Sequence, residues 1–249
     1  MGNPVLSEQL FRKSAQSGAT GVMTVSGTAT KTLLLLFMVI AGAAYSWKMY
    51  YEAINPASVN GWMMGGALVG FILSMVISFK PTTAPFLSPI YAAAEGLFLG
   101  GISAMFNNQF AETAPNIVIN SVALTLLTAL IMFTVYRANI IKVNGTFMKV
   151  MTIALITILV FYFGSFLLSL FGVDTSVLHN SSPLSIGISI VIVAVAAFSL
   201  LMDYNFIEKA AAAGAPKYME WYGAFGLIVT LVWLYLEILK LLAKFNSRD

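Results

Sequence analysis

The chain has no cysteine and a single histidine, His179. The absence of cysteine excludes a disulfide framework and any metal or redox site built on thiolates. A single histidine excludes every mechanism that needs two histidine side chains. Charge is scarce as well, because only 9% of the residues are Asp, Glu, Lys or Arg, against about 25% in ordinary soluble domains. So few charges cannot cover a water-facing surface, which argues against a soluble enzyme and against a disordered chain.

The basic residues form no run, and 13 Lys and Arg barely exceed 10 Asp and Glu. This argues against a nucleic-acid partner. Apolar residues make up 59% of the chain, and the mean hydropathy is +0.88. They form unbroken runs of about 20 residues, the length of a membrane-crossing helix, whereas a transmembrane barrel alternates over about ten. We therefore expect an all-α polytopic membrane protein with the lipid bilayer as a partner.

Seven apolar runs are long enough to cross a bilayer, and short loops with Pro, Gly or Asn separate them. We expect one seven-helix transmembrane domain, residues 32–249, after a polar tail, residues 1–31. That tail is too long for the basic segment of a signal peptide, and the first run continues past the small residues 41–43, so we expect it to be retained. The predicted spans are 32–51, 61–79, 86–106, 116–136, 150–171, 183 to at least 202, and 223–242.

Lysine and arginine predict the orientation, because cytoplasmic loops are enriched in both. When the loops are assigned to alternate sides, most basic residues gather with the N-terminus, which predicts a cytoplasmic N-terminus. The basic C-terminal tail disagrees with seven full crossings, and a re-entrant last segment would return that tail to the cytoplasm. The first side holds Arg12, Lys13, Lys31, Lys80, Arg137, Lys142, Lys149, Lys209 and Lys217, and the second holds Lys48, Lys240, Lys244 and Arg248.

Three acids lie within or at the edge of the predicted spans: Glu95, Asp203 and Glu237. A charged side chain at the centre of a membrane helix costs about 2.5–3.5 kcal/mol on insertion scales, so such a residue is a candidate functional site.

Glu95 lies beside a stripe of small residues that recurs every four positions, and the preceding span carries a similar stripe. Small residues at this spacing let helices approach closely in lipid. We therefore expect the second and third spans to pack together and Glu95 to face protein. It then acts in the ion pathway, or it is a protonated acid hydrogen-bonded to a neighbour. The stripes are Gly66, Gly70, Ser74 and Ser78, and Ser88, Ala92, Gly96, Gly100 and Ala104.

Glu237 ends a series spaced alternately by three and four residues, which places its members on one helix face. The series is Gly223, Gly226, Thr230, Trp233 and Glu237. We expect Glu237 to point into the bundle. The alternative is an ion pair with Lys240, three residues later, near the interface.

Asp203 follows Ala196 and Ser199 on a small, polar face. If its helix stopped at residue 202, Asp203 would lie in headgroup water. Residues 204–213 contain no helix breaker, however, and Gly214 and Pro216 then provide a stop. We expect the helix to continue about ten residues past Asp203.

The chain resembles the transmembrane Bax inhibitor motif family over nearly its whole length, and four segments carry this resemblance. FSLLMDYNFIEKA (198–210) is similar to the acid motif of its sixth helix, WLYLEILKLL (233–242) to its last helix, and GLFLG (96–100) to its Gly-rich third helix. MTVSGTATKT (23–32) is similar to a bacterial branch, which implies the bacterial cytoplasmic membrane. The resemblance implies a seven-helix bundle with the last helix central, and a calcium leak gated by a hydrogen-bonded, pH-sensing carboxylate pair, here Asp203 and Glu237. In eukaryotic members it also implies suppression of cell death.

Two departures from the family pattern bear on this expectation. The second acid is Glu237 rather than an aspartate, and the family's basic latch in the second helix has no clear equivalent, with Lys80 the nearest cation. Calcium takes about 6–8 oxygen ligands, and two acids with Thr230 or Ser199 fall well short. We therefore expect weak, transient calcium binding at Asp203 and Glu237, with calcium as the permeant ion and no cofactor.

Other classes of function remain open. No serine–base, metal-ligand or phosphate-loop motif is present, so we do not expect an enzyme. A proton-coupled transporter would suit buried acids, but seven spans do not divide into paired repeats. A non-conducting regulatory or interaction protein is the other alternative, with its protein partner on the tail 1–31.

Overall fold

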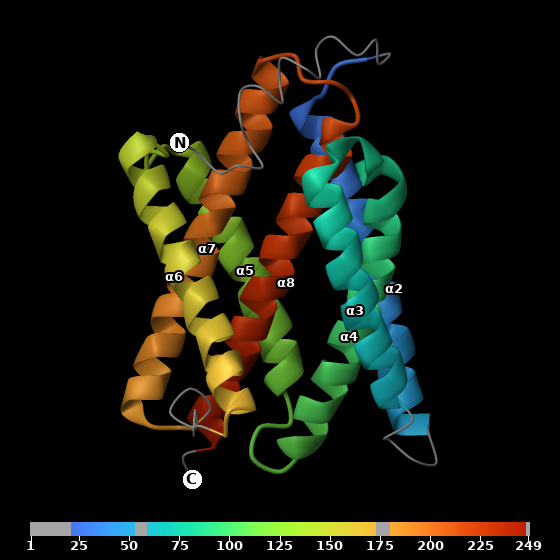
Figure 1. Cartoon of the computed structure of the whole chain (residues 1–249), viewed down its shortest axis with the longest axis vertical. Helices are drawn as coiled ribbons and strands as arrows, with labels where there is room; N and C mark the ends of the chain where they lie inside the picture. Colours follow the sequence, from blue (N-terminus) through green and yellow to red (C-terminus); the bar gives the residue numbers. More distant parts are fainter. Residues whose placement is uncertain (1–20, 53–58, 173–179, 248–249) are drawn as a thin grey trace. The chain divides into compact units, whose positions relative to one another are not determined.

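The structure is a computed structural model that describes residues 21–52, 59–172 and 180–247. Among these residues there are seven long α-helices (Figure 1), one 3-10 turn, η3 (Pro81–Thr83), and no strand. All seven helices are long and apolar enough to cross a membrane. The predicted all-α membrane fold is confirmed. The helices are α2 (Val25–Glu52), α3 (Val59–Phe79), α4 (Ala84–Gln109), α5 (Ile117–Arg137), α6 (Gly145–Leu170), α7 (Pro183–Ala212) and α8 (Met219–Asn246).

Several helices extend beyond the apolar runs that predicted them. α2 begins at Val25, seven residues before the predicted span, because a helix can continue where its residues become polar. α7 continues from Asp203 to Ala212, as expected, and Gly214 follows with a φ of 72°, a conformation that favours glycine. α8 is one unbroken helix of 28 residues. A re-entrant segment needs a break, so the continuity of α8 favours a full crossing.

The described chain forms two compact units. The first contains the residues up to Gln109 together with Asn205–Val229, and the second contains Phe110–Tyr204 and the residues from Thr230 onward. α7 and α8 therefore each contribute residues to both units. Part of the predicted tail, residues 1–20, and His179 lie outside the described residues. The predicted division into a tail and one transmembrane domain stays a prediction.

In the first unit, the small-residue stripe of α4 packs against α2. A Cβ added to Gly96 or Gly100 would meet the backbone of α2 at Val39 or Ala43, well inside contact distance. From the other side, a Cβ on Gly42 would lie 2.7 Å from the carbonyl oxygen of Ala93. The prediction that this stripe contacts the second span was therefore wrong, because four-residue spacing identifies a close-packing face but not its partner.

The contact between α3 and α4 is nonetheless real, and it uses a different face of α4. A Cβ on Gly66 would lie 2.6 Å from the carbonyl oxygen of Ala94 and 3.2 Å from the Leu97 side chain. α4 thus packs against both α2 and α3, which explains why about half of its most apolar stretch is buried.

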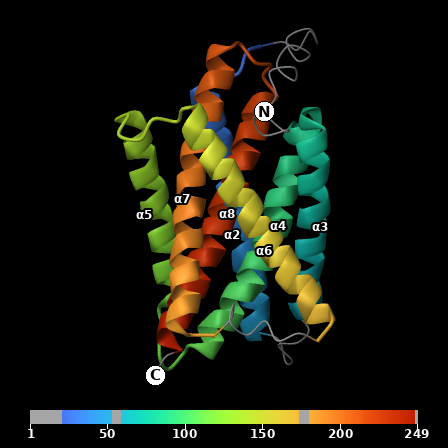
Figure 2. The same cartoon turned by 60° about the vertical axis from the view of Figure 1, so that its left-hand side comes forward.

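The second unit contains α5, α6 and parts of α7 and α8; α5, α6 and α7 are labelled in Figure 2. The Tyr204 hydroxyl on α7 donates a 3.1 Å hydrogen bond to the carbonyl oxygen of Ala129 on α5. On the α6 side of α7, the rings of Phe147 and Phe198 meet edge to face. These contacts hold α7 between α5 and α6.

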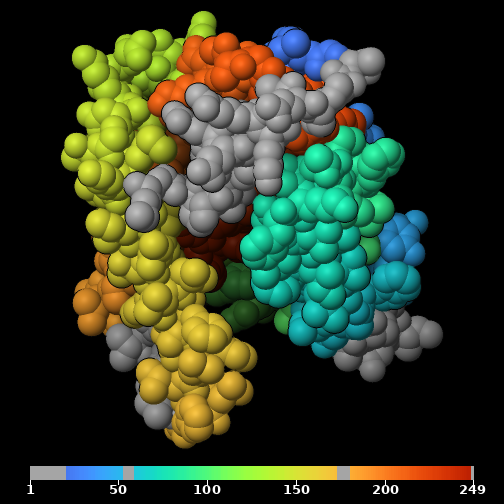
Figure 3. All heavy atoms as spheres, turned by 45° about the horizontal axis from the view of Figure 1, so that its top comes forward, coloured from blue at the N-terminus to red at the C-terminus, as the bar shows by residue number. Residues whose placement is uncertain are grey.

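Burial differs sharply among the helices. More than half of the most apolar stretch of α8 is buried, whereas the corresponding stretch of α6 has no buried residue. Figure 3 shows α3, in teal, and α6, in yellow, as outward surfaces of side chains. Most of their exposed residues are large and apolar, which is expected of helices that face lipid. The helix with the most buried apolar stretch is α8, and it carries one of the candidate acids.

Candidate functional site

Asp203 lies on α7 in the second unit, where it meets α8. The Thr230 hydroxyl on α8 donates a hydrogen bond to its carboxylate. The other carboxylate oxygen, Oδ2, is buried and has no hydrogen-bond partner among the described residues. A buried polar atom without a partner costs about 1–3 kcal/mol. The helix extension past Asp203 draws this carboxylate away from the helix end.

Glu237 lies on α8 in the same unit and is 2% exposed. Its Oε1 is 2.6 Å from Lys240 Nζ, so the predicted alternative of an ion pair within α8 is present. The Tyr162 hydroxyl on α6 lies 3.1 Å from Oε1 and 3.0 Å from Oε2. Lys240 Nζ also lies over the Tyr162 ring, 5.0 Å from its centroid. The Glu237 carboxylate is therefore paired with the Lys240 ammonium group and accepts a hydrogen bond from the Tyr162 hydroxyl.

The two acids thus have separate partners. Asp203 bonds to Thr230, and Thr230 precedes Glu237 by seven residues on α8. Seven residues advance an α-helix by about 10 Å. Asp203 thus contacts the helix that carries Glu237. The two acids do not form the direct hydrogen bond that the family resemblance implies. Their roles as a pH sensor and a weak calcium site stay predictions.

Glu95 lies on α4 in the first unit and faces α3. A Cβ on Gly70 would lie 2.5 Å from its Oε2 and 3.9 Å from the ring of Tyr91. Glu95 therefore faces protein, as expected, and the glycine in α3 provides the space for its carboxylate. The structure places it in a different unit from Asp203 and Glu237.

Lys80, the nearest equivalent of a basic latch, is exposed at the end of α3. Its backbone N–H donates to the carbonyl oxygen of Val76. The described residues contain no group of three His, Asp or Glu side chains that could hold a metal ion. This does not test the expectation of weak, transient calcium binding, which stays a prediction.

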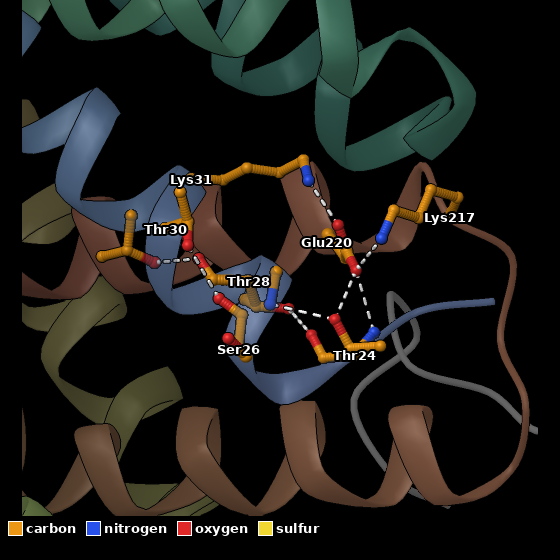
Figure 4. A network of polar contacts seen from close by, with 9 residues as sticks. Thr24, Ser26, Thr28, Thr30, Lys31, Lys217 and Glu220 are labelled. Atoms are coloured by element: carbon orange, nitrogen blue, oxygen red, sulfur yellow. Dashed lines mark hydrogen bonds and ion pairs between the residues drawn. The ribbon is translucent and has the colours of Figure 1, made fainter. Parts of the chain in front are cut away.

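The densest set of polar contacts around one carboxylate was not predicted, and Figure 4 shows it around Glu220 in the first turn of α8. Glu220 is fully buried. Its Oε1 accepts hydrogen bonds from the Thr24 backbone N–H and hydroxyl, each at 2.9 Å, and from Lys217 Nζ at 2.8 Å. Its Oε2 forms an ion pair with Lys31. We call Thr24, Lys31, Lys217 and Glu220 the Glu220 clasp.

The Glu220 clasp joins the start of α2 to the start of α8, within the first unit. A signal for it was available: Gly27 in the polar start of α2, and an acid just after the stop at Pro216. Lys31 and Glu220 are nonetheless 189 residues apart in the chain. Neither periodicity nor spacing relates residues over such a distance.

Comparison with known proteins gives one match. The sequence model of a family described as "Bax inhibitor 1 like" matches residues 3–247, nearly the whole chain. No curated protein and no solved structure matches. The predicted membership of this family is thereby confirmed, whereas the bacterial branch stays a prediction.

Proposed function

Because the chain belongs to the Bax inhibitor 1 like family, we propose that it is a pH-sensitive, passive calcium-permeable channel. It acts as a calcium leak in the bacterial cytoplasmic membrane, with its N-terminus in the cytoplasm. It uses no cofactor and performs no enzymatic reaction. The distribution of lysine and arginine among the loops supports the orientation.

The observation that carries the proposal is the Asp203 carboxylate, which Thr230 holds and whose buried Oδ2 lacks a partner among the described residues. An acid at membrane depth that is not fully satisfied is characteristic of proton and ion pathways. A proton removes the charge of this carboxylate, and a cation gives the free oxygen a partner. pH and calcium then act on the same group.

The number of oxygens supports passage rather than storage of calcium. Asp203 and Thr230 together offer three side-chain oxygens, whereas calcium takes about 6–8. An ion that passes this point keeps most of its water ligands. Glu237 adds negative charge on the same helix, but Lys240 neutralises it at 2.6 Å. We therefore assign the pH response to Asp203 and a separate electrostatic role to the Glu237–Lys240 pair.

Calcium flux into proteoliposomes, with calcium and proton gradients varied separately, tests the proposal. Wild-type protein should pass calcium down its gradient with a rate that depends on pH. Asp203→Asn preserves the shape and removes the titration, so its flux should no longer depend on pH. Glu237→Gln should change the rate but retain the pH dependence.

One control variant and three possible outcomes make the result decisive. Glu95→Gln, in the other unit, should resemble the wild type. If Asp203→Asn keeps the wild-type pH profile, Asp203 is not the sensor. Wild-type liposomes that pass no more calcium than empty ones would refute the channel itself. Calcium transport that follows an imposed proton gradient would instead identify a proton-coupled transporter.

A further inference from the structure

The Glu220 clasp lies apart from the residues of the proposed function and has its own chemistry. Glu220 accepts contacts from four donors, two of them lysine ammonium groups (Figure 4). The side chains of Lys31 and Lys217 are 18% and 48% exposed. Water therefore reaches the lysines while the carboxylate between them is buried. Because water reaches these lysines, their contacts with Glu220 are replaced by contacts with water more easily than the packed backbones of α2 and α4 are separated.

The start of α2 is shaped to receive this carboxylate. The Thr24 hydroxyl accepts a 2.9 Å hydrogen bond from the Gly27 backbone N–H, as a helix-capping residue does. The negative charge of Glu220 therefore lies at a helix N-terminus, where the backbone dipoles favour it. A Cβ on Gly27 would lie within 2.5 Å of three carboxylate atoms of Glu220. Glycine at this position is what allows the two helix starts to meet.

The backbone beside the Glu220 clasp is paired as well. The Met23 N–H donates to the carbonyl oxygen of Ala215 at 2.8 Å, and the Lys217 N–H donates to that of Gly21 at 3.2 Å. Val22 and Pro216 thereby form an isolated antiparallel bridge. The segment before α2 and the loop between α7 and α8 are thus joined by two backbone hydrogen bonds and the Glu220 carboxylate.

We infer that the Glu220 clasp is a releasable connection that fixes the segment before α2 to the start of α8, and that its release changes the calcium leak. The second half of this inference rests on the proposed function. Glu220 and Thr230 lie on one continuous helix, ten residues or about 15 Å apart. When Glu220 loses its contacts, the start of α8 is free to move, and Thr230 moves with the same helix relative to Asp203.

Hydrogen exchange tests the connection without reference to calcium. Glu220→Gln removes the charge that binds both lysines, and Gly27→Ala displaces the carboxylate while leaving every charge in place. In either variant the amides of Met23, Thr24 and Lys217 should exchange roughly tenfold faster or more than in the wild type. Glu52→Gln is the matched control, because it removes an exposed acid paired with Lys48 at 3.7 Å. Its exchange at those amides should equal that of the wild type.

A reversible cross-link separates release from misfolding. Val22 and Pro216 are a non-hydrogen-bonded antiparallel pair, whose Cα atoms lie about 4.5 Å apart, a separation that a disulfide spans. Since the chain has no cysteine, Val22→Cys with Pro216→Cys can form only this disulfide within one molecule. In the Glu220→Gln background, oxidation should restore slow exchange and the wild-type leak rate at one fixed pH, and reduction should reverse both.

The possible results distinguish the two halves of the inference. Unchanged amide exchange in both Glu220→Gln and Gly27→Ala overturns the connection. Faster exchange with an unaltered leak rate overturns the coupling to α8 and leaves a purely structural contact. If wild-type liposomes pass no calcium, the proposed function fails, and the exchange and cross-linking measurements still decide whether the clasp releases.

Discussion

The Tyr162 hydroxyl on α6 lies within 3.1 Å of both carboxylate oxygens of Glu237 on α8. A phenol has one hydroxyl proton, so the two oxygens share a single donor. Lys240 completes the group from one helical turn away. The contact connects the least buried helix to the most buried one.

Tyr162→Phe removes this donor and keeps the ring that Lys240 contacts. Hydrogen bonds to charged groups contribute about 1.5–3 kcal/mol, so we expect the free energy of unfolding to fall by roughly that amount. Thermal unfolding in detergent measures it. Tyr45→Phe is the control, since Tyr45 is 54% exposed on α2, and it should unfold like the wild type. Equal unfolding temperatures for Tyr162→Phe and wild type would contradict the contact.

Gly100→Ala tests the packing of α4 on α2. The added Cβ would collide with the Ala43 backbone and the Ser46 hydroxyl, and such overpacking costs about 1–3 kcal/mol. Gly65→Ala is matched, because a Cβ there meets nothing within 4 Å and alanine is the better helix former by about 1 kcal/mol. We expect Gly100→Ala to lower and Gly65→Ala to raise the unfolding temperature. A change of the same sign in both variants would argue against the close approach.

Thr230→Val removes the hydroxyl that donates to Asp203 and preserves the shape of the side chain. The carboxylate then loses its donor on α8, which we expect to destabilise the fold by about 1–3 kcal/mol near neutral pH. Thr230→Ser retains the hydroxyl and should recover most of the loss. Chemical or thermal unfolding at constant pH makes the comparison. If valine and serine variants are equally stable, the Thr230 hydroxyl does not stabilise Asp203.

The orientation can be tested at Lys142, which is exposed after the end of α5. The native chain has no cysteine, so Lys142→Cys provides one labelling site. We expect membrane-impermeant thiol reagents to label it only after cells are opened, because the lysine and arginine distribution predicts that this loop is cytoplasmic. Labelling in intact cells would reverse the orientation.

Much of the fold follows directly from the sequence. Apolar runs identified all seven helices, and the lack of a breaker before Gly214 predicted that α7 continues past Asp203. The three-residue spacing of Glu237 and Lys240 predicted their ion pair as an alternative. Each of these features depends on residues close together in the chain. Local sequence determines such features because helix periodicity and helix stops act within a few turns.

Contacts between helices that are far apart in the chain could not be predicted from the sequence. The small residues of α4 predicted close packing, but α2 rather than α3 receives Gly96 and Gly100. The Glu220 clasp was missed for the same reason, since Lys31 and Lys217 entered only the orientation argument and no local pattern singled out Glu220. Tyr162 lies within the predicted span 150–171, where no pattern singles it out, although its hydroxyl completes the environment of Glu237.

The exposure of α6 has a consequence for how the protein responds to its surroundings. Among the residues of α6, Met151 alone is buried, so acyl chains cover most of the helix and its tilt follows the thickness of the bilayer. Tyr162 transmits a change in that tilt to Glu237, the acid on α8 that it contacts. Bilayers of lipids with different acyl-chain length should therefore alter the surroundings of Glu237 at constant sequence, pH and calcium concentration. Lipid composition would then affect the protein independently of pH and calcium.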